Sequence, residues 1–145
     1  ETKADEDYLE QLKKQIATKG LTNAVDFVGP IPHSEVNSNL CRAKVFVHAS
    51  KTGSLDKVLL EALAVGTPVV SSAAGAKALP LGNWQISSKE AFAKEILKIL
   101  GQGNQADIIR LQQHVRQHHS LMNLIEDICF QLAQNGKISG NYVTD

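Results

Sequence analysis

The fold is decided by Val58–Val70, whose sequence reads VLLEALAVGTPVV. Leu and Ala dominate its first part, up to Val65, so this part is predicted to form a helix. Gly66 ends that helix and Pro68 turns the chain. The apolar run that then ends at Ser71 has the continuous character of a strand covered on both faces. A helix followed at once by a buried strand indicates an α/β protein.

The same two patterns recur on both sides of this stretch. Apolar residues at helical spacing predict helices over residues 5–19, 34–42, 88–100, 105–118 and 120–134. Runs rich in Val, Ile and Phe predict strands over residues 25–28 and 45–49, and a short last strand over 84–86. Ser87 and Glu90 fit a capping box that opens the helix over 88–100.

Strands that alternate with helices argue for a parallel, doubly wound sheet covered by helices, which is a Rossmann-like α/β architecture. In such sheets ligands bind beyond the carboxyl ends of the strands. Here those ends lead into three loops, residues 29–33, 50–54 and 71–76. We expect the three loops to share one cleft, with the small-residue loop after residue 71 facing the one after residue 50.

Composition describes a single domain over residues 1–145, with a loose tail over 136–145. The 15 Lys and Arg balance the 15 Asp and Glu, so nothing favours nucleic acid or an anionic membrane as the main partner. No apolar run reaches the roughly 20 residues of a transmembrane segment. We expect a cytoplasmic protein, with peripheral membrane contact through another domain left open.

Glu61 is the most informative single residue. The segment from Asp56 to Val65 is apolar nearly everywhere except at Asp56, Lys57 and Glu61, so the carboxylate is predicted to be largely buried and to need donors. One interpretation is an i,i+4 pair with Lys57, which contributes only about 0.2–0.5 kcal/mol. The other is a carboxylate that accepts two hydroxyl hydrogens, as from a ribose diol.

The loop before this helix has the chemistry of an anion site. Small residues from Ser50 to Ser54 let backbone N–H groups approach a ligand, and the helix that follows adds a partial positive charge. A simple turn with an N-cap fits the same residues, and the chain contains neither a Walker pattern nor GxGxxG.

Histidines offer two further candidates. His114 and His118 are four residues apart, next to His119, so a shared metal is conceivable, but a solvated or packing face fits better because no third ligand is obvious. We therefore predict no metal site. His48 ends a predicted strand beside the expected cleft. It either contacts a ligand there or is a core histidine with hydrogen bonds inside the protein.

Three segments resemble, in order and spacing, the C-terminal domain of family 4 (group 1) glycosyltransferases. They are FVGPIPHSE at 27–35, AKVFVHAS at 43–50 and the stretch at 58–70, and the resemblance spans about residues 8–132. Residues 119–121 are similar to a weaker motif near the end of that domain. The resemblance implies a GT-B enzyme of two Rossmann-like domains, in which this domain binds the nucleotide-sugar donor. Such enzymes are typically retaining and need no bound metal or other cofactor.

The resemblance also implies which residues bind the donor. Glu61 matches the second Glu of the family's E-x7-E motif, which holds the donor ribose. The segment 29–31 matches the chain that lies against the nucleobase, and the loop at 53–55 faces the donor phosphates and sugar. The full set that we expect at the donor is Gly29, Pro30, Ile31, Lys51, Gly53, Ser54, Leu55, Glu61 and Gly75.

The chain departs from the family pattern at three places. The first Glu of E-x7-E falls at Gly53, so the carboxylate that grips the donor sugar is absent. The common Gly-Gly-x-x-Glu becomes Gly75 to Leu79, without the acid. The Arg and Lys pair that neutralises the leaving diphosphate lies upstream of this sequence, as does the acceptor-binding domain. The sequence assigns no catalytic residue, and we expect this chain alone to be incompetent for transfer.

Strand order predicts an incomplete sheet. In the order 3-2-1-4-5-6, residues 25–28 correspond to strand 3 and residues 45–49 to strand 4. Strands 1 and 2 would then precede Glu1. We expect either a fragment of a longer polypeptide or a sheet that a partner chain or a rearranged pairing completes, because an open apolar edge invites pairing.

Three functions follow from these observations. The first is the donor-side part of a glycosyltransferase, which binds a nucleotide sugar and serves transfer to an unidentified acceptor. The second is a noncatalytic nucleotide-binding or interaction module that kept the fold after losing the acid at Gly53. The third is a sugar-nucleotide epimerase of the same fold. It is less favoured, because the sequence of the stretch at 58–70 is more similar to that of transferases.

Overall fold

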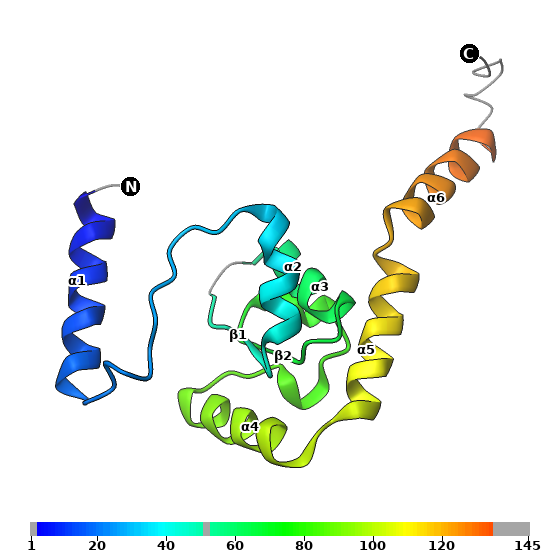
Figure 1. Cartoon of the computed structure of the whole chain (residues 1–145). Helices are drawn as coiled ribbons and strands as arrows, with labels where there is room; N and C mark the ends of the chain where they lie inside the picture. The colour runs from blue at the N-terminus through cyan, green and yellow to red at the C-terminus, as the bar shows by residue number, and fades with distance from the viewer. Residues whose placement is uncertain (1–2, 51–52, 135–145) are drawn as a thin grey trace. The chain divides into compact units, whose positions relative to one another are not determined.

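The computed structural model describes residues 3–50 and 53–134 of the chain (Figure 1). The chain divides into two compact units, Glu1–Pro32 and His33–Asp145. The tail predicted over residues 136–145 lies outside the described residues, and the single-domain organisation stays a prediction.

The first unit consists of one helix and an irregular segment. Helix α1 (Lys3–Thr18) confirms the helix predicted over residues 5–19. Gly20 takes a left-handed φ of 68°, and the Leu21 amide donates to the Ile16 carbonyl at 3.0 Å, so the chain turns back at this point. Beyond residue 24 the chain runs without regular structure to Pro32.

The prediction of a strand over residues 25–28 is wrong. Val25, Phe27 and Val28 are exposed, and no strand is assigned to them. A β-branched run becomes a strand only where a neighbouring strand accepts and donates its backbone hydrogen bonds. The one sheet of the described chain contains two other segments, so this run has no ladder partner.

The second unit alternates helices and short strands. Its elements are α2 (His33–Arg42), β1 (Phe46–His48), α3 (Lys57–Ala64), β2 (Val69–Ser71), the 3₁₀ turns η1 (Ala74–Ala78) and η2 (Gly82–Trp84), α4 (Lys89–Gln102), α5 (Gln105–His118) and α6 (Leu121–Gln134). The predicted helices and the strands at 45–49 and 68–71 are confirmed, with shifted ends.

The sheet is small and parallel. β1 pairs with β2 so that Phe46 is opposite Val69 and His48 is opposite Ser71. The last predicted strand, over residues 84–86, is reduced to one parallel bridge between Ser71 and Gln85. A mostly helical α/β unit with a parallel sheet confirms the predicted fold class, as part of a Rossmann-like domain.

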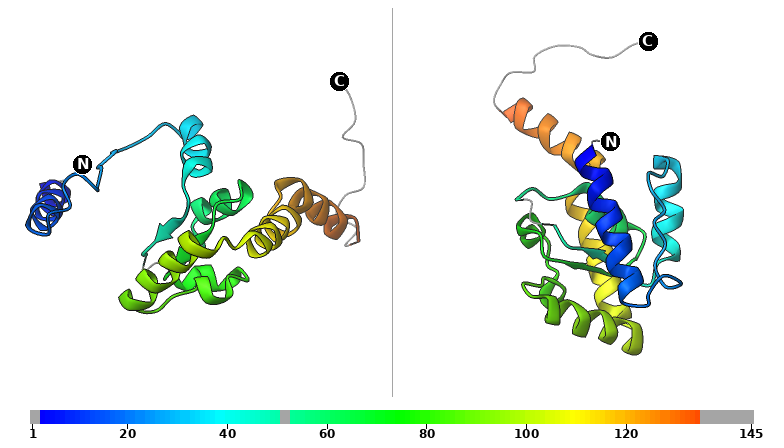
Figure 2. Two further views of the ribbon diagram at one scale, coloured as in Figure 1. Left: turned by 60° about the horizontal axis from the view of Figure 1, so that its bottom comes forward. Right: turned by 90° about the vertical axis from the view of Figure 1, so that its left-hand side faces the viewer.

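Helices cover this sheet and enclose the core. α3 packs against α2, α5 and β2, and α4 packs against β2 (Figures 1 and 2). All three residues of β2 are buried, as its continuous apolar character predicts. The largest fully buried side chains are Leu59, Leu63, Leu111, Val69, Val70 and Ser71.

The start of α4 differs by one residue from the predicted capping box. Ser88, rather than Ser87, is the N-cap, and its side chain accepts a hydrogen bond from the Ala91 amide at 3.2 Å. Both serines have a hydroxyl that can cap the helix, so the sequence pattern does not distinguish between them. The backbone conformation of the preceding turn decides which serine is the N-cap.

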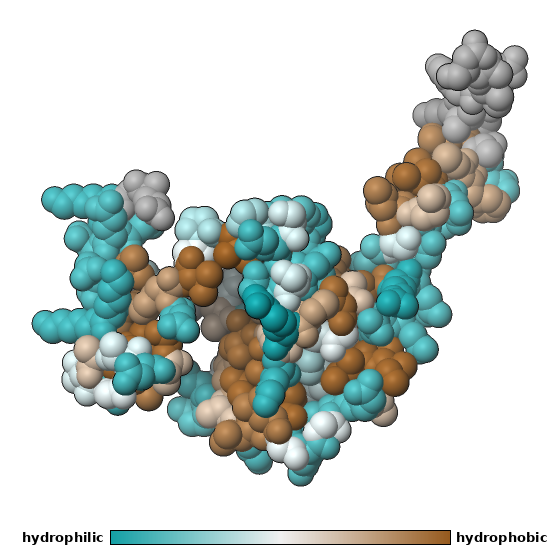
Figure 3. Space-filling model, in the orientation of Figure 1, coloured by the Kyte–Doolittle hydropathy of each residue, from teal (hydrophilic) through white to brown (hydrophobic). Residues whose placement is uncertain are grey.

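α6 carries mostly apolar side chains that remain exposed, and these gather as brown atoms along the helix (Figure 3). Examples are Leu121, Ile125 and Ile128. No helix in the described ranges is both long and apolar enough to cross a membrane.

The carboxyl end of α3 is held by contacts that are distant in sequence. Gly66, with φ of 84°, ends the helix, and the Gln112 side-chain amide on α5 donates to the Ala64 carbonyl at 2.8 Å. The Thr67 hydroxyl donates to the Leu40 carbonyl at 2.7 Å. α3 is thereby fixed to both α2 and α5, which sets the position of Glu61.

Gln112→Met removes the bond to α3 while keeping the length of the side chain. We expect the free energy of unfolding to fall by about 0.5–1.5 kcal/mol, the net contribution of one hydrogen bond. Urea denaturation followed by circular dichroism measures it. Gln113→Met, at an exposed neighbouring position, is the matched control. Equal stability of the two variants would contradict the role of Gln112.

Candidate functional site

The predicted phosphate loop joins β1 to α3. Lys51 lies outside the described residues, so its predicted role at the diphosphate stays a prediction. Gly53 and Ser54 are exposed, and Leu55 is half-buried and packs against the core. A Cβ added at Gly53 would meet no atom within 4 Å, so the position has room for a larger side chain.

The two small-residue loops of the second unit touch. A Cβ added at Gly75 would overlap the backbone carbonyl of Ser54 and the amide of Leu55. Only glycine permits this approach, because any side chain would push one backbone away from the other. The structure thus brings together Ser54, Leu55 and Gly75 of the predicted donor set.

Glu61 lies on α3, on the helix that follows this loop. Its side chain is 20% exposed and lies 3.4 Å from the ammonium group of Lys57, whose side chain is 78% exposed. The i,i+4 pair that the sequence left open is therefore present. An ion pair with so exposed a lysine contributes little, so it does not account for placing a carboxylate here. The ribose-binding role stays a prediction.

His48 connects the ends of both strands to the start of α3. Its Nδ1 lies 3.2 Å from the Ser71 hydroxyl, and its Nε2 lies 2.9 Å from a carboxylate oxygen of Asp56. The Ser71 hydroxyl also accepts a hydrogen bond from the Ala73 amide at 3.1 Å. Of the two interpretations left open for His48, hydrogen bonding within the structure is the one observed.

This Ser, His and Asp arrangement is structural rather than nucleophilic. Ser71 has 0% of its surface exposed, so no substrate reaches its hydroxyl. The chain of hydrogen bonds instead ties β1, β2 and the N-terminus of α3 together. These contacts were not predicted from the sequence, although His48 and Ser71 both lie at carboxyl ends of predicted strands and are opposite each other in the parallel register.

A cavity of about 430 Å³ opens at the same edge of the sheet. It is lined by Ser50, Ser72, Ala74, Lys77, Gln85, Ile86 and Ser87. None of these belongs to the predicted donor set. Their position in the sequence could have indicated this cavity, because these residues come after β1, after β2 or at and after the bridge formed by Gln85.

The nucleobase segment belongs to the first unit. Gly29 has a left-handed φ of 70°, and Gly29, Pro30 and Ile31 are all exposed. Their contact with a nucleobase stays a prediction, as does a single cleft shared with the loops of the second unit.

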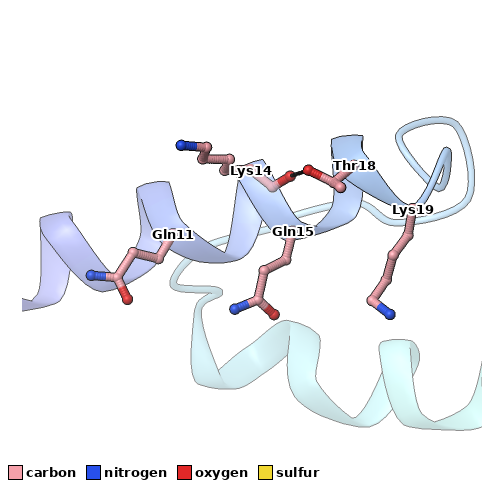
Figure 4. A pocket seen from close by; sticks show the side chains of 5 residues that line it. All are labelled: Gln11, Lys14, Gln15, Thr18 and Lys19. Atoms are coloured by element: carbon pink, nitrogen blue, oxygen red, sulfur yellow. Dashed lines mark hydrogen bonds between the residues drawn. The ribbon is translucent and has the colours of Figure 1, made fainter.

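The first unit has a cavity of its own on α1, with a volume of about 440 Å³ (Figure 4). Its lining residues are Gln11, Lys14, Gln15, Thr18 and Lys19. The Thr18 hydroxyl donates to the Lys14 carbonyl at 2.8 Å. Amide and ammonium groups along one helix do not form the acid, base or phosphate-binding arrangement of an active site.

Three histidines cluster at the end of α5, where His119 follows the last helical residue. The ring of His114 lies 4.6 Å from that of His118 and 5.8 Å from that of His119, measured between ring centroids. Burial and these two neighbours lower the pKa of His114, because each disfavours a further positive charge. Among the described residues, no group of three His, Cys, Asp or Glu side chains could hold a metal ion.

The model of the family described as "Glycosyl transferases group 1" matches residues 4–114. Neither the search of curated proteins nor that of solved structures found a match.

Proposed function

The chain belongs to the group 1 glycosyltransferases, and on this premise we propose that it binds the nucleotide-sugar donor of a transfer reaction. The family supports glycosyl transfer in general. The nucleotide sugar, a retaining and metal-independent reaction, and the narrower assignment to family 4 are parts of the proposal.

One observation carries it: the Glu61 side chain keeps 20% of its surface exposed on α3, the helix that follows the loop in which Ser54 contacts Gly75. An ionised carboxylate only accepts hydrogen bonds, and a ribose diol offers two hydroxyl donors. The backbone N–H groups at the start of α3 and the helix dipole suit a phosphate near the same loop. Helix α3 and the loop before it thus offer one complementary partner to the ribose and one to the diphosphate.

In the proposed reaction, the bond between the anomeric carbon and the diphosphate oxygen breaks and a bond from that carbon to an acceptor oxygen forms. The acceptor hydroxyl loses its proton, and the diphosphate leaves with the bonding electrons. Negative charge therefore develops on the diphosphate, where preorganised dipoles and cations lower the barrier. The described loop offers dipoles, and Lys51 is our candidate cation.

We also propose that the sheet is completed by strands outside this sequence or by a partner chain. Val47, at the centre of β1, is 44% exposed, and β1 has β2 as its one neighbour in the described sheet. A central apolar residue with this exposure is typical of an edge that another strand covers. The acceptor-binding domain of the proposed enzyme would lie in the same additional sequence.

The alternative of a noncatalytic nucleotide-binding module rests on Gly53, where the family's first acid is missing. Calorimetric titration with UDP, GDP, ADP and CDP tests the binding that both functions share. Release of the nucleoside diphosphate from a nucleotide sugar, measured on the chain supplied with its acceptor domain, separates them. Binding without such release would favour the module.

We expect nucleoside diphosphate binding to be unchanged by EDTA, because the described residues of the predicted donor set include no cluster of carboxylates or histidines. Affinity would then come from ribose, base and backbone contacts. Calorimetry of the same nucleotide with EDTA and with added Mg²⁺ measures this. Binding that requires Mg²⁺ would contradict the metal-independent proposal.

A further inference from the structure

Helix α3 begins at a residue whose side chain does not cap it. Asp56 is the N-cap residue, with an extended backbone (φ of −72°, ψ of 127°), and its carbonyl accepts from the Leu59 amide at 3.0 Å. Aspartate is among the preferred N-cap residues, because its carboxylate can accept a hydrogen bond from an amide of the first turn. Within the described residues of α3, no amide makes such a bond with Asp56.

The Asp56 carboxylate is held instead by His48, the last residue of β1. The Nε2 atom of His48 lies 2.9 Å from Oδ2 of Asp56. An ionised carboxylate only accepts hydrogen bonds, so Nε2 carries the hydrogen of this bond. The side chain of His48 is 14% exposed and that of Asp56 is 31% exposed. Solvent and salt therefore screen this pair less than a fully exposed one.

The orientation of the His48 ring is fixed from its other side. Nδ1 lies 3.2 Å from the hydroxyl of Ser71, a fully buried residue whose oxygen accepts from the Ala73 amide at 3.1 Å. The hydroxyl hydrogen of Ser71 can then be donated to Nδ1, which assigns to His48 the neutral tautomer with hydrogen on Nε2. The ring of Phe46 stacks on the imidazole, with centroids 6.2 Å apart. The sheet thus presents the Nε2–H group to Asp56 in a defined direction.

The position of this carboxylate matters for a diphosphate at the start of α3. The proposed function uses the amides of the first helical turn, where the helix dipole favours an anion. A carboxylate bound to those amides would occupy donors that the diphosphate needs, and it would place a negative charge beside the ligand. The hydrogen bond from His48 opposes this arrangement, because Asp56 must break it in order to cap α3.

We propose that His48 is a positioning residue for the donor diphosphate: by binding the Asp56 carboxylate, it keeps the first-turn amides of α3 available to the diphosphate. The inference rests on the proposed function and deepens it, because it names the group that controls access to the phosphate part of the same site. His48 acts through Asp56 and not by contact with the donor.

His48→Leu removes the donor and keeps a bulky side chain beside Phe46. Asp56 is then able to cap α3, and the diphosphate has to displace it. We expect the affinity for the tightest-binding of UDP, GDP, ADP and CDP to fall about 3- to 30-fold, the ratio that a capping interaction of usual strength implies. The parent nucleoside, which has no phosphate, should bind as it does to the original chain. NMR titration measures both affinities, and a variant that merely damages the fold would weaken both.

Two further changes at this pair separate positioning from structural loss. His48→Gln, whose side-chain amide can donate from about the place of the ring Nε2, should retain the original affinity. In a chain that already carries Asp56→Ala, His48→Leu should leave diphosphate binding unchanged, because no carboxylate remains to cap α3. His118→Ala, at an exposed histidine of α5, is the matched control for the loss of an imidazole.

A second pair of variants leaves His48 in place and serves even if His48→Leu fails to fold. Asp56→Ser supplies a good capping hydroxyl on a side chain one bond shorter, which His48 restrains less, whereas Asp56→Ala supplies no capping group. We expect Asp56→Ser to bind the nucleoside diphosphate about 3- to 30-fold more weakly than Asp56→Ala does.

The outcomes separate this inference from the proposed function. Inorganic pyrophosphate is titrated in parallel, with the backbone amides of Lys57 and Val58 as the NMR readout. Nucleotide binding that these variants do not change, or that His48→Leu weakens equally in the Asp56→Ala chain, overturns only the inference. Pyrophosphate binding that His48→Leu weakens, without any nucleotide binding, supports the role of His48 and contradicts the proposed function. Binding of neither probe overturns both.

Discussion

Gly75→Ala lowers the free energy of unfolding by about 1–3 kcal/mol, the usual cost of overpacking a close contact. The added methyl group would overlap the Ser54 carbonyl and the Leu55 amide, which are backbone atoms and cannot rotate away. One loop must move, so we also expect weaker nucleoside diphosphate binding. Urea denaturation and calorimetry measure the two effects.

Gly101→Ala is the matched control for this prediction. Gly101 lies in the last turn of α4, where an added Cβ meets no atom within 4 Å. Alanine favours the helix over glycine, so we expect a gain of up to about 1 kcal/mol in the free energy of unfolding. The same chemical change thus has opposite signs at the two sites. A Gly75→Ala protein as stable as the original would show that the loops do not touch.

Glu61→Gln weakens nucleoside diphosphate binding by about 1.5–3 kcal/mol, or about 10- to 150-fold. The change keeps the size of the side chain but replaces a charged acceptor by a neutral amide. Folding stability should change little, because the carboxylate is partly exposed and its pair with Lys57 is a surface pair. Calorimetry with the tightest-binding nucleotide measures the loss.

A deoxynucleotide shows whether the lost interaction is with the ribose. The original chain should bind the 2′-deoxy form of that nucleotide more weakly than the ribose form, whereas Glu61→Gln should bind the two alike. Lys57→Met, which removes the partner of the ion pair and leaves the carboxylate, should preserve the discrimination. Equal affinities of the original chain for both nucleotides would remove Glu61 from the ribose site.

Several features of the fold were predictable because they depend on neighbours in sequence. Gly66 and Pro68 separate α3 from β2, and the apolar character of each segment decides its type without reference to the rest of the chain. The run at residues 25–28 has an equally strong β pattern, yet it forms no strand. A strand needs a hydrogen-bonding neighbour, and sequence pattern does not supply one.

The candidate site was likewise predictable only in those parts that depend on neighbours in sequence. Glu61 and the small-residue loop from Ser50 to Ser54 were predicted from residue type and position, and the membership of the chain in the group 1 family was confirmed. Their roles at the donor stay predictions. The contact between Gly75 and Ser54 and the chain from Ser71 through His48 to Asp56 were not found. Each joins residues whose approach depends on how the strands and helices pack.

The sequence by itself determined the family, the parallel α/β character and the presence of a carboxylate, Glu61, on the helix α3. These properties are local, since they depend on side-chain periodicity, turn residues and a contiguous motif. Only the tertiary structure decided that Gly75 must be glycine, that the His48 ring contacts Ser71 and Asp56, and that Gln85 lines a cavity. Backbone overlap, hydrogen-bond pairing and cavity volume depend on distances between segments, and those distances exist only after the chain has packed.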